Sequence, residues 1–220
     1  MGKISTLNQH QKEILAEIAN NSQICSRYYF TGGTALSEYY LHHRVSVDLD
    51  FFSEQKQDPE ILLDVISKLR NKFGVQVQAR NLEVVNIYNL AFPDGVKLKV
   101  DFGYYPYRRV EKSGRRVGKM EVDSLVDIAV NKLSTITQRA EVKDFVDLYF
   151  LLKKFTFWDL RNGVKVKFGI DVDPYVAAND FVALDIFEYL PEMIRPLTLD
   201  QLKDFFRKEA IKLGRMAVED

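Results

Sequence analysis

The fold of this chain is decided by residues 28–52, which read YYFTGGTALSEYYLHHRVSVDLDFF. The apolar residues before Gly32 predict a short strand that ends in a glycine turn, and Thr34 stands near the start of a helix. Asp48 and Asp50 then follow in a stretch where apolar and polar residues alternate, which is typical of a strand. The stretch therefore predicts a strand, a glycine turn, a helix and a second strand that carries two carboxylates.

The two aspartates are expected to project together, because residues two apart on a strand point to the same side of a sheet. Val47, Leu49 and Phe51 are then expected to face the other side. Two carboxylates about 4 Å apart repel by roughly 4 kcal/mol at an effective dielectric constant of 20, so they need a cation between them or a proton on one of them. Mg²⁺ suits such oxygens, and Mn²⁺ is the alternative ion. The simpler interpretation is that Asp48 and Asp50 only cap a loop.

A third carboxylate, Asp101, is expected at the end of a strand over residues 95–103. The apolar residues of this strand that should face the core are Val96, Leu98, Val100 and Phe102. Three carboxylates can hold two metal ions and clamp the oxygens of an in-line displacement. Asp101 is expected to complete the metal site and to act as, or orient, the catalytic base. The alternative is a solvated strand end.

The glycine turn offers a place for phosphate groups. Gly32 and Gly33 let the backbone turn tightly and let a phosphate approach its N–H groups, and the helix that starts near Thr34 adds the positive end of its dipole. Alone, two glycines indicate only a tight turn. Together with the aspartates, they indicate that both elements grip one metal–nucleotide complex.

This ordered set of motifs resembles the AbiEii/AbiGii toxin family, within the polymerase-beta-like superfamily of minimal nucleotidyltransferases. The superfamily often has Gly-Ser where this chain has Gly32-Gly33. The resemblance implies an enzyme of the EC 2.7.7 type that moves a nucleoside monophosphate from a nucleoside triphosphate to an acceptor hydroxyl. It also implies a toxin of a toxin–antitoxin or phage-defence module, with a cognate antitoxin protein as partner. The implied acceptor is an RNA, with tRNA ends as the first candidate, or a protein hydroxyl.

The resemblance continues through residues 127–152, DIAVNKLSTITQRAEVKDFVDLYFLL. The residues that match the family pattern are Lys132, Arg139, Lys143, Asp144 and Asp147. It implies that Lys132 contacts the triphosphate and that Asp144 acts in the site, positioning the acceptor or Lys132. The alternatives are a lysine that reaches out to solvent and an aspartate that complements the dipole of a helix. Asp147 fits a structural role equally well.

Arg44 and Ser46 precede the aspartates and are expected to help bind the nucleotide. Ser46 shares the strand face of Asp48 and Asp50, so its hydroxyl is expected near a phosphate or a metal-bound water. The alternative for Arg44 is an ion pair with Asp48.

The whole chain has 220 residues and equal numbers of basic and acidic side chains, 31 each. Zero net charge argues against a protein that coats nucleic acid non-specifically. The single cysteine excludes an internal disulfide, and no apolar run approaches the roughly 20 residues of a membrane span. The polar N-terminus lacks the apolar core of a signal peptide. We therefore expect a cytoplasmic protein without a membrane partner.

The predicted fold class is α+β. We expect a nucleotidyltransferase-fold mixed sheet with flanking helices over residues 1–120 and a mainly helical domain, packed against it, over residues 121–220. Within the helical part, residues 158–171 and 190–200 are expected to interrupt the helices. A hairpin is expected around Ser113-Gly114.

Residues 108–119 form a locally basic segment, with six basic side chains against Glu111. Tyr104, Tyr105 and Tyr107 come just before it. Basic groups beside aromatic rings suit an RNA backbone and unstacked bases, although a solvated hairpin explains them equally well.

Two other functions fit parts of the sequence. The first is a catalytically inactive nucleotide- or partner-binding module of the same fold, against which the three acids argue. The second is an aspartyl phosphatase, suggested by VDLDFF, but Phe52 stands where that motif requires threonine.

Overall fold

The computed structural model describes residues 5–219, with side chains described as far as Arg215, and it divides into two compact units. The first unit comprises the described residues up to Tyr40 together with Val45–Arg108 and Lys112–Ser124. The second comprises Leu41–Arg44, Arg109–Glu111 and the chain from Leu125 onward. The sequence predicted a boundary near residue 120, between parts over residues 1–120 and 121–220, of which residues 1–4 and 220 lie outside the described structure. In the structure the chain enters the second unit for the last time at Leu125, after two short segments, Leu41–Arg44 and Arg109–Glu111, that also belong to it.

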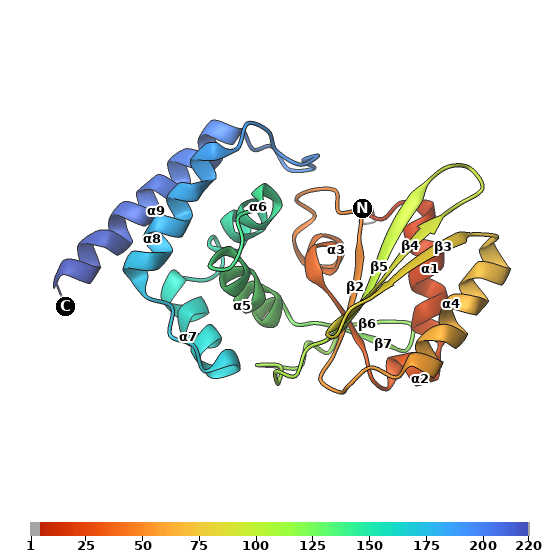
Figure 1. Cartoon of the computed structure of the whole chain (residues 1–220). Coiled ribbons are helices and arrows are strands. Elements are labelled where there is room, and N and C mark those ends of the chain that lie inside the picture. Colours follow the sequence, from red (N-terminus) through yellow and green to blue (C-terminus); the bar gives the residue numbers. More distant parts are fainter. Residues whose placement is uncertain (1–4, 220) are drawn as a thin grey trace. The chain divides into compact units, whose positions relative to one another are not determined.

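The first unit is built on a mixed β-sheet (Figure 1). In the described part of the chain this sheet has seven strands in the order β3-β4-β5-β2-β1-β7-β6. The pairs β2–β5 and β1–β7 are parallel and the other neighbours are antiparallel. The strands are β1 (Tyr29–Thr31), β2 (Leu49–Ser53), β3 (Gln76–Asn81), β4 (Val85–Ala91), β5 (Lys97–Tyr104), β6 (Arg116–Val117) and β7 (Met120–Val122). The predicted mixed sheet is thus confirmed.

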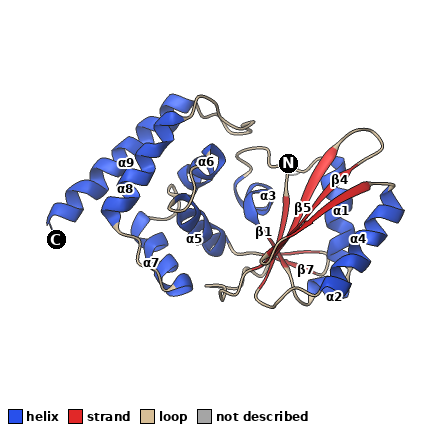
Figure 2. Ribbon diagram, in the orientation of Figure 1, coloured by secondary structure: helices blue, strands red, loops and turns tan. Residues whose placement is uncertain are grey.

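The helices of this unit flank the sheet. They are α1 (Gln9–Asn20), α2 (Ser22–Cys25), α3 (Gly32–Leu36), which continues into the π-helical turn η1 (Ser37–Leu41), and α4 (Pro59–Phe73). Helices α1, α2 and α4 lie together on one side of the sheet (Figure 2), whereas α3 packs against β1 and β2. The core between them includes the fully buried rings of Phe30, Phe51 and Phe102.

The register of three neighbouring strands fixes the positions of the predicted site residues. Thr31, the last residue of β1, pairs with Asp50 on β2. Asp50 in turn pairs with Asp101 on the parallel strand β5. Because paired residues on neighbouring strands project from the same face of a sheet, the glycine turn after Thr31 and the two carboxylates meet at one place.

Some details of the sheet differ from the sequence-based prediction. Strand β2 begins only at Leu49, so Val47, which the alternation placed in the strand, lies before it and is 63% exposed. Strand β5 begins at Lys97, which leaves Val96 37% exposed, and it continues past Asp101 instead of ending there. The last hairpin turns at Gly118, because β6 and β7 pair on either side of it, and not at Ser113-Gly114.

The second unit is helical. Its described elements are α5 (Leu125–Ile136), α6 (Val142–Leu151), α7 (Phe157–Phe168), α8 (Pro174–Val182), the 3-10 turn η2 (Ala183–Ile186) and α9 (Leu199–Glu219). Helices α8 and α9 lie side by side. Between η2 and α9 the chain leaves helical structure, as expected for residues 190–200, although α9 already starts at Leu199.

Helix α7 contradicts the interruption that was predicted over residues 158–171. A capping box starts the helix: the Thr156 hydroxyl accepts a hydrogen bond from the Asp159 amide, and the Asp159 carboxylate accepts one from the Thr156 amide. Gly163 lies inside the helix and faces α5 so closely that an added Cβ would collide with Cγ2 of Val130. Its lack of a side chain serves helix packing.

Among the described residues, no helix combines the length and apolar character required to cross a membrane.

Candidate active site

The first part of the site joins the glycine turn to the second aspartate. Gly32 has a φ of +76°, a conformation that favours glycine. A Cβ built on Gly32 would lie 2.8 Å from the Cγ and 2.9 Å from the Cβ of Asp50, which is closer than atoms pack. Position 32 therefore requires glycine for two reasons: the backbone has a positive φ, and the Asp50 carboxylate occupies the space that a side chain would need.

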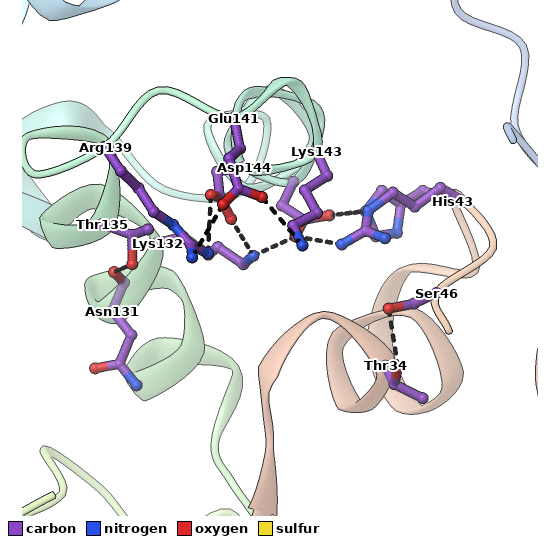
Figure 3. A network of polar contacts seen from close by, with 12 residues as sticks. Thr34, His43, Ser46, Asn131, Lys132, Thr135, Arg139, Glu141, Lys143 and Asp144 are labelled. Carbon is purple, nitrogen blue, oxygen red and sulfur yellow. Dashed lines mark hydrogen bonds and ion pairs between the residues drawn. The ribbon is translucent and has the colours of Figure 1, made fainter. Parts of the chain in front are cut away.

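Thr34 and Ser46 hold the segment that leads to the first aspartate. The Thr34 hydroxyl is buried and forms a hydrogen bond of 2.8 Å with the Ser46 hydroxyl (Figure 3). It also forms a hydrogen bond with the carbonyl oxygen of Asp48. The Ser46 carbonyl oxygen accepts a hydrogen bond of 2.8 Å from Gln11 on α1. Both hydroxyls thus fix the backbone before β2, and their contact with a phosphate stays a prediction.

A lysine that the sequence analysis did not assign lies among the carboxylates. The Lys99 ammonium donates a hydrogen bond of 2.6 Å to Oδ2 of Asp101 and lies 4.0 Å from Oδ2 of Asp48. Burial disfavours its charged form, but Asp101, Asp48 and Asp50 outweigh burial and raise the pKa of Lys99. In this structure a cation thus lies where the repulsion argument required one.

The three aspartates do not form a ready-made metal cage. In the part of the chain that the structure describes, no three carboxylate, imidazole or thiolate groups are gathered closely enough to hold a metal ion. The Asp101 side chain is only 12% exposed, whereas that of Asp48 is 27% exposed. Asp48 thus lies at the open side of the group and Asp101 at its base.

The second unit contains a buried network of charges around Asp147. Arg44 is buried and donates two hydrogen bonds to this carboxylate, from Nε at 2.7 Å and from Nη2 at 2.8 Å. His43 Nε2 lies 2.7 Å from Oδ1 of the same carboxylate. Arg44 thus pairs with Asp147 and not with Asp48, the partner considered from the sequence.

Lys132 completes this network (Figure 3). Its ammonium lies 2.7 Å from Oδ1 of Asp144 and 2.6 Å from Oδ2 of Asp147. Asp144 therefore contacts Lys132, as one of its two expected roles requires. Arg139, half exposed, approaches the other oxygen of Asp144 at 3.2 Å, while Lys143 pairs instead with Glu141 at 3.1 Å.

These contacts shift the pKa values of the buried groups in the directions that preserve the ion pairs. Burial alone would raise the pKa of Asp147, but Lys132 and Arg44 bring it well below its usual range. Burial opposes the charge of Lys132, but Asp147 and Asp144 raise the pKa of that ammonium. Burial lowers the pKa of His43, and its hydrogen bond to Asp147 only partly opposes this effect.

The basic segment over residues 108–119 is partly committed to structural contacts. Arg115 lies over the ring of Tyr40 at 4.8 Å, Arg116 approaches Glu121 at 3.8 Å, and Lys119 donates to the Ser22 hydroxyl at 2.8 Å. The exposed side chains of Arg108 and Lys112 have no such contact among the described residues.

The backbone between Arg108 and Lys112 is anchored within the second unit. The amides of Val110 and Glu111 donate hydrogen bonds of 2.8 and 3.0 Å to the Asp127 carboxylate. Asp127 also forms a fully buried ion pair of 2.6 Å with Lys167 on α7.

The structure thus distributes the predicted site residues over both units. The first unit brings together Gly32, Gly33, Thr34, Ser46, Asp48, Asp50 and Asp101, and the second brings together Arg44, Lys132 and Asp144. Lys99 and His43 are polar residues of these groups that the sequence analysis did not assign. For Lys99 a signal was present, because it stands two residues before Asp101 on a strand and therefore shares its face.

Comparison with known proteins agrees with this geometry. Two solved structures resemble the chain over almost its whole length at low identity, and therefore show the fold. JHP933 from Helicobacter pylori gives a TM-score of 0.60 at 21% identity, covering 97% of this chain and 95% of that one. MenT4, a nucleotidyltransferase toxin from Mycobacterium tuberculosis, gives 0.62 at 18% identity, covering 93% and 82%. The mixed sheet with its helical partner unit is thus a nucleotidyltransferase fold.

The sequence comparison names the family. Residues 13–215 match the family described as nucleotidyl transferase AbiEii toxin, type IV TA system. A protein of Aquifex aeolicus, described only as uncharacterized, is 30% identical over 209 residues, which are 92% of this chain and 95% of that protein. This chain belongs to the AbiEii family of nucleotidyltransferase toxins, as the resemblance of its motifs predicted.

Proposed function

We propose that this protein is a metal-dependent nucleotidyltransferase that moves a nucleoside monophosphate from a nucleoside triphosphate to an acceptor hydroxyl and releases pyrophosphate. The observation that carries the proposal is the junction of Gly32, Asp50 and Asp101, where a glycine turn and two carboxylates on paired strands meet. Backbone N–H groups of the turn would bind phosphate, and the carboxylate oxygens beside them would bind a cation, which are the two requirements of a metal–nucleotide complex.

The metal would be held by Asp48, Asp50 and Asp101. The donor set fits Mg²⁺, because this ion prefers carboxylate oxygens and usually takes only one or two of them, together with waters and substrate phosphates. The Lys99 ammonium supports the fit, since a cation is already stabilised among these groups. When bound, Mg²⁺ would neutralise charge on the phosphates during transfer.

The chain's own residues would mostly position the reactants. The turn at Gly32-Gly33 would receive the triphosphate, and Thr34 and Ser46 would keep Asp48 in place through the contacts described above. The least exposed of the three aspartates, Asp101, would orient the acceptor hydroxyl and take its proton. Lys132, held by Asp144 and Asp147, would contact the triphosphate.

The acceptor that suits the surface best is an RNA. Arg108 and Lys112 offer cations to a phosphate backbone, and Tyr107, 39% exposed, offers a ring to an unstacked base. Tyr107 is itself oriented by the ring of Tyr105, whose centroid lies 5.0 Å away. A toxin family implies a cognate antitoxin as partner, and the protein would be the toxin of a toxin–antitoxin or phage-defence module.

A labelling experiment tests this function. The purified protein would be mixed with Mg²⁺ and each α-phosphate-labelled nucleoside triphosphate, with and without total tRNA, beside an Asp48→Asn control. Label that moves to RNA and is lost in the control supports the proposal and identifies base and acceptor. Label on protein alone makes a protein hydroxyl the acceptor. Nucleotide-dependent thermal stabilisation without any labelled product, with RNA and candidate protein acceptors supplied, would identify an inactive binding module instead.

A further inference from the structure

The feature that the proposed reaction leaves unexplained is the position of Lys99. Its ammonium is bonded to Asp101 at 2.6 Å and lies 4.0 Å from Asp48, two of the three proposed metal ligands. A side chain two residues before Asp101 on β5 lies on the same face of the sheet as Asp101. The strand geometry therefore positions the Lys99 ammonium beside the carboxylates. The lysine is also only partly exposed, at 38%, and is therefore not a solvated strand residue.

We propose that Lys99 is the resident counter-cation of the carboxylate group, and that a divalent ion binds by displacing its ammonium from Asp101. This inference rests on the proposed metal site. Without metal, Lys99 relieves the repulsion among Asp48, Asp50 and Asp101, so the site stays folded and closed to weakly bound cations. With metal, the freed ammonium remains on a flexible four-carbon stem beside the site, where it suits a phosphate oxygen.

The displacement follows from the oxygen that Lys99 and the metal would share, Oδ2 of Asp101. Oδ2 of Asp101 cannot accept the short bond from Lys99 and coordinate a metal along the same direction, and two cations at this distance would repel each other. Metal coordination through this oxygen therefore breaks the Lys99–Asp101 pair. Breaking a partly exposed pair costs little, so the lysine lowers metal affinity without abolishing it.

The first test measures metal affinity directly. Mn²⁺ binding to the full chain would be followed by titration calorimetry or electron paramagnetic resonance in the wild type, in Lys99→Met and in Lys97→Met. Lys97 is a matched control, because it lies on the same strand and face but is exposed. We expect Lys99→Met to bind Mn²⁺ about fivefold more tightly, and Lys97→Met to bind like the wild type. Asp50→Asn, which lacks a ligand, identifies the binding that belongs to this site.

The second test separates displacement from a simple charge effect, and it does not need a variant. The rate at which an acylating reagent modifies Lys99, relative to Lys97, would be measured by mass spectrometry with and without Mn²⁺. Displacement predicts that metal speeds the modification of Lys99, because its ammonium is released from Asp101. This test decides the question even if Lys99→Met does not fold.

The outcomes are distinct. Equal Mn²⁺ affinity in wild type and Lys99→Met, or Lys99 modification that is unchanged or slower with metal, overturns the inference and leaves the metal site intact. No Mn²⁺ binding at this site in any variant overturns the proposed metal dependence and the inference with it. Tighter binding in Lys99→Met alone, together with faster modification of Lys99, supports both.

Discussion

The Asp50 carboxyl group fills the space in front of Gly32 that any larger residue would need. The two residues belong to different motifs, the glycine turn and the aspartate pair, yet their side-chain and backbone atoms are in direct contact. The turn and the carboxylates are thus a single structural unit.

Gly32→Ala should destabilise the protein more than an ordinary glycine substitution. Gly114 is a matched control, since it has a φ of +66° and no atom within 4 Å of an added Cβ. Gly114→Ala should cost about 1–2 kcal/mol for the backbone conformation alone. Gly32→Ala should cost about 1–3 kcal/mol more, because it also forces Asp50 to move. Chemical denaturation of both variants measures the difference, and equal losses would contradict the contact.

Asp50→Asn should separate activity from stability. Loss of a carboxylate that the transition state requires should lower the transfer rate at least ~100-fold. The substitution keeps the shape and removes repulsion, so the free energy of unfolding without metal should stay equal or rise. Transfer assays and metal-free denaturation test both parts. A clear drop in metal-free stability would count against the assignment of Asp50 to a repulsive carboxylate group.

Asp147→Asn should be strongly destabilising. It leaves the buried charges of Arg44 and Lys132 without their main partner, which typically costs about 3–5 kcal/mol. The matched control is Asp204→Asn, because Asp204 is 64% exposed and its pair with Arg207 is long, at 3.5 Å. The control should change the free energy of unfolding by less than about 1 kcal/mol. Similar values for both variants would show that the network contributes little.

His43 should make stability depend on pH in the range just below neutrality. The unfolded chain binds a proton at this residue near pH 6.5, whereas burial lowers the pKa of His43 in the folded protein. Below about pH 6.5 the unfolded state therefore binds more protons, so the free energy of unfolding falls as the pH decreases, by up to about 1.4 kcal/mol per pH unit.

The variant His43→Gln isolates this effect, because glutamine still offers an N–H donor to Asp147 but cannot titrate. Denaturation of the wild type and the variant between pH 5 and pH 7, expressed as a difference, removes the contributions of the other histidines. The free energy of unfolding of the wild type, relative to that of His43→Gln, should decrease as the pH falls. A difference that is independent of pH would mean that His43 titrates normally in the folded protein.

Replacing Arg108 and Lys112 together by alanine should weaken RNA binding equally for all sequences, since phosphate contacts carry no base information. The slope of the logarithm of affinity against the logarithm of salt concentration should fall by about 2, one for each cation. Lys68→Ala is the control, because Lys68 lies outside this segment, on helix α4, and is paired with Asp64. An unchanged slope in the double variant would remove this segment from the RNA interface.

The sequence predicts the fold well where the signals are local. The order of strand, glycine turn, helix and aspartate strand needs only alternation and turn residues. The start of α4 has an equally local signal, since its N-cap Asp58 is followed directly by Pro59. The extent of β2 was wrong at Val47, because alternation continues before Leu49 although no neighbouring strand pairs there. Helix α7 was missed because Gly163 resembles a break until its packing against Val130 is known.

The site contacts that escaped prediction are those that depend on distant parts of the chain. His43 and Arg44 find Asp147 more than 100 residues away, and no periodicity connects them. Lys99 was overlooked because a lysine on a strand ordinarily reaches solvent. Its spacing from Asp101 already places both side chains on one face, and the parallel pairing of β2 with β5 adds that Asp50 lies beside them.

The two excursions at Leu41–Arg44 and Arg109–Glu111 have a consequence for anyone who would cut or graft this protein. A fragment that starts near residue 120 contains every long helix of the second unit, yet it lacks the guanidinium that Asp147 requires and the two amides bound to Asp127. In such a fragment the buried carboxylates of Asp147 and Asp127 would lose these hydrogen-bond partners, so we expect that it does not fold by itself. The helical unit is assembled from three separate sequence segments, so a fragment intended to contain this unit must include nearly the whole chain.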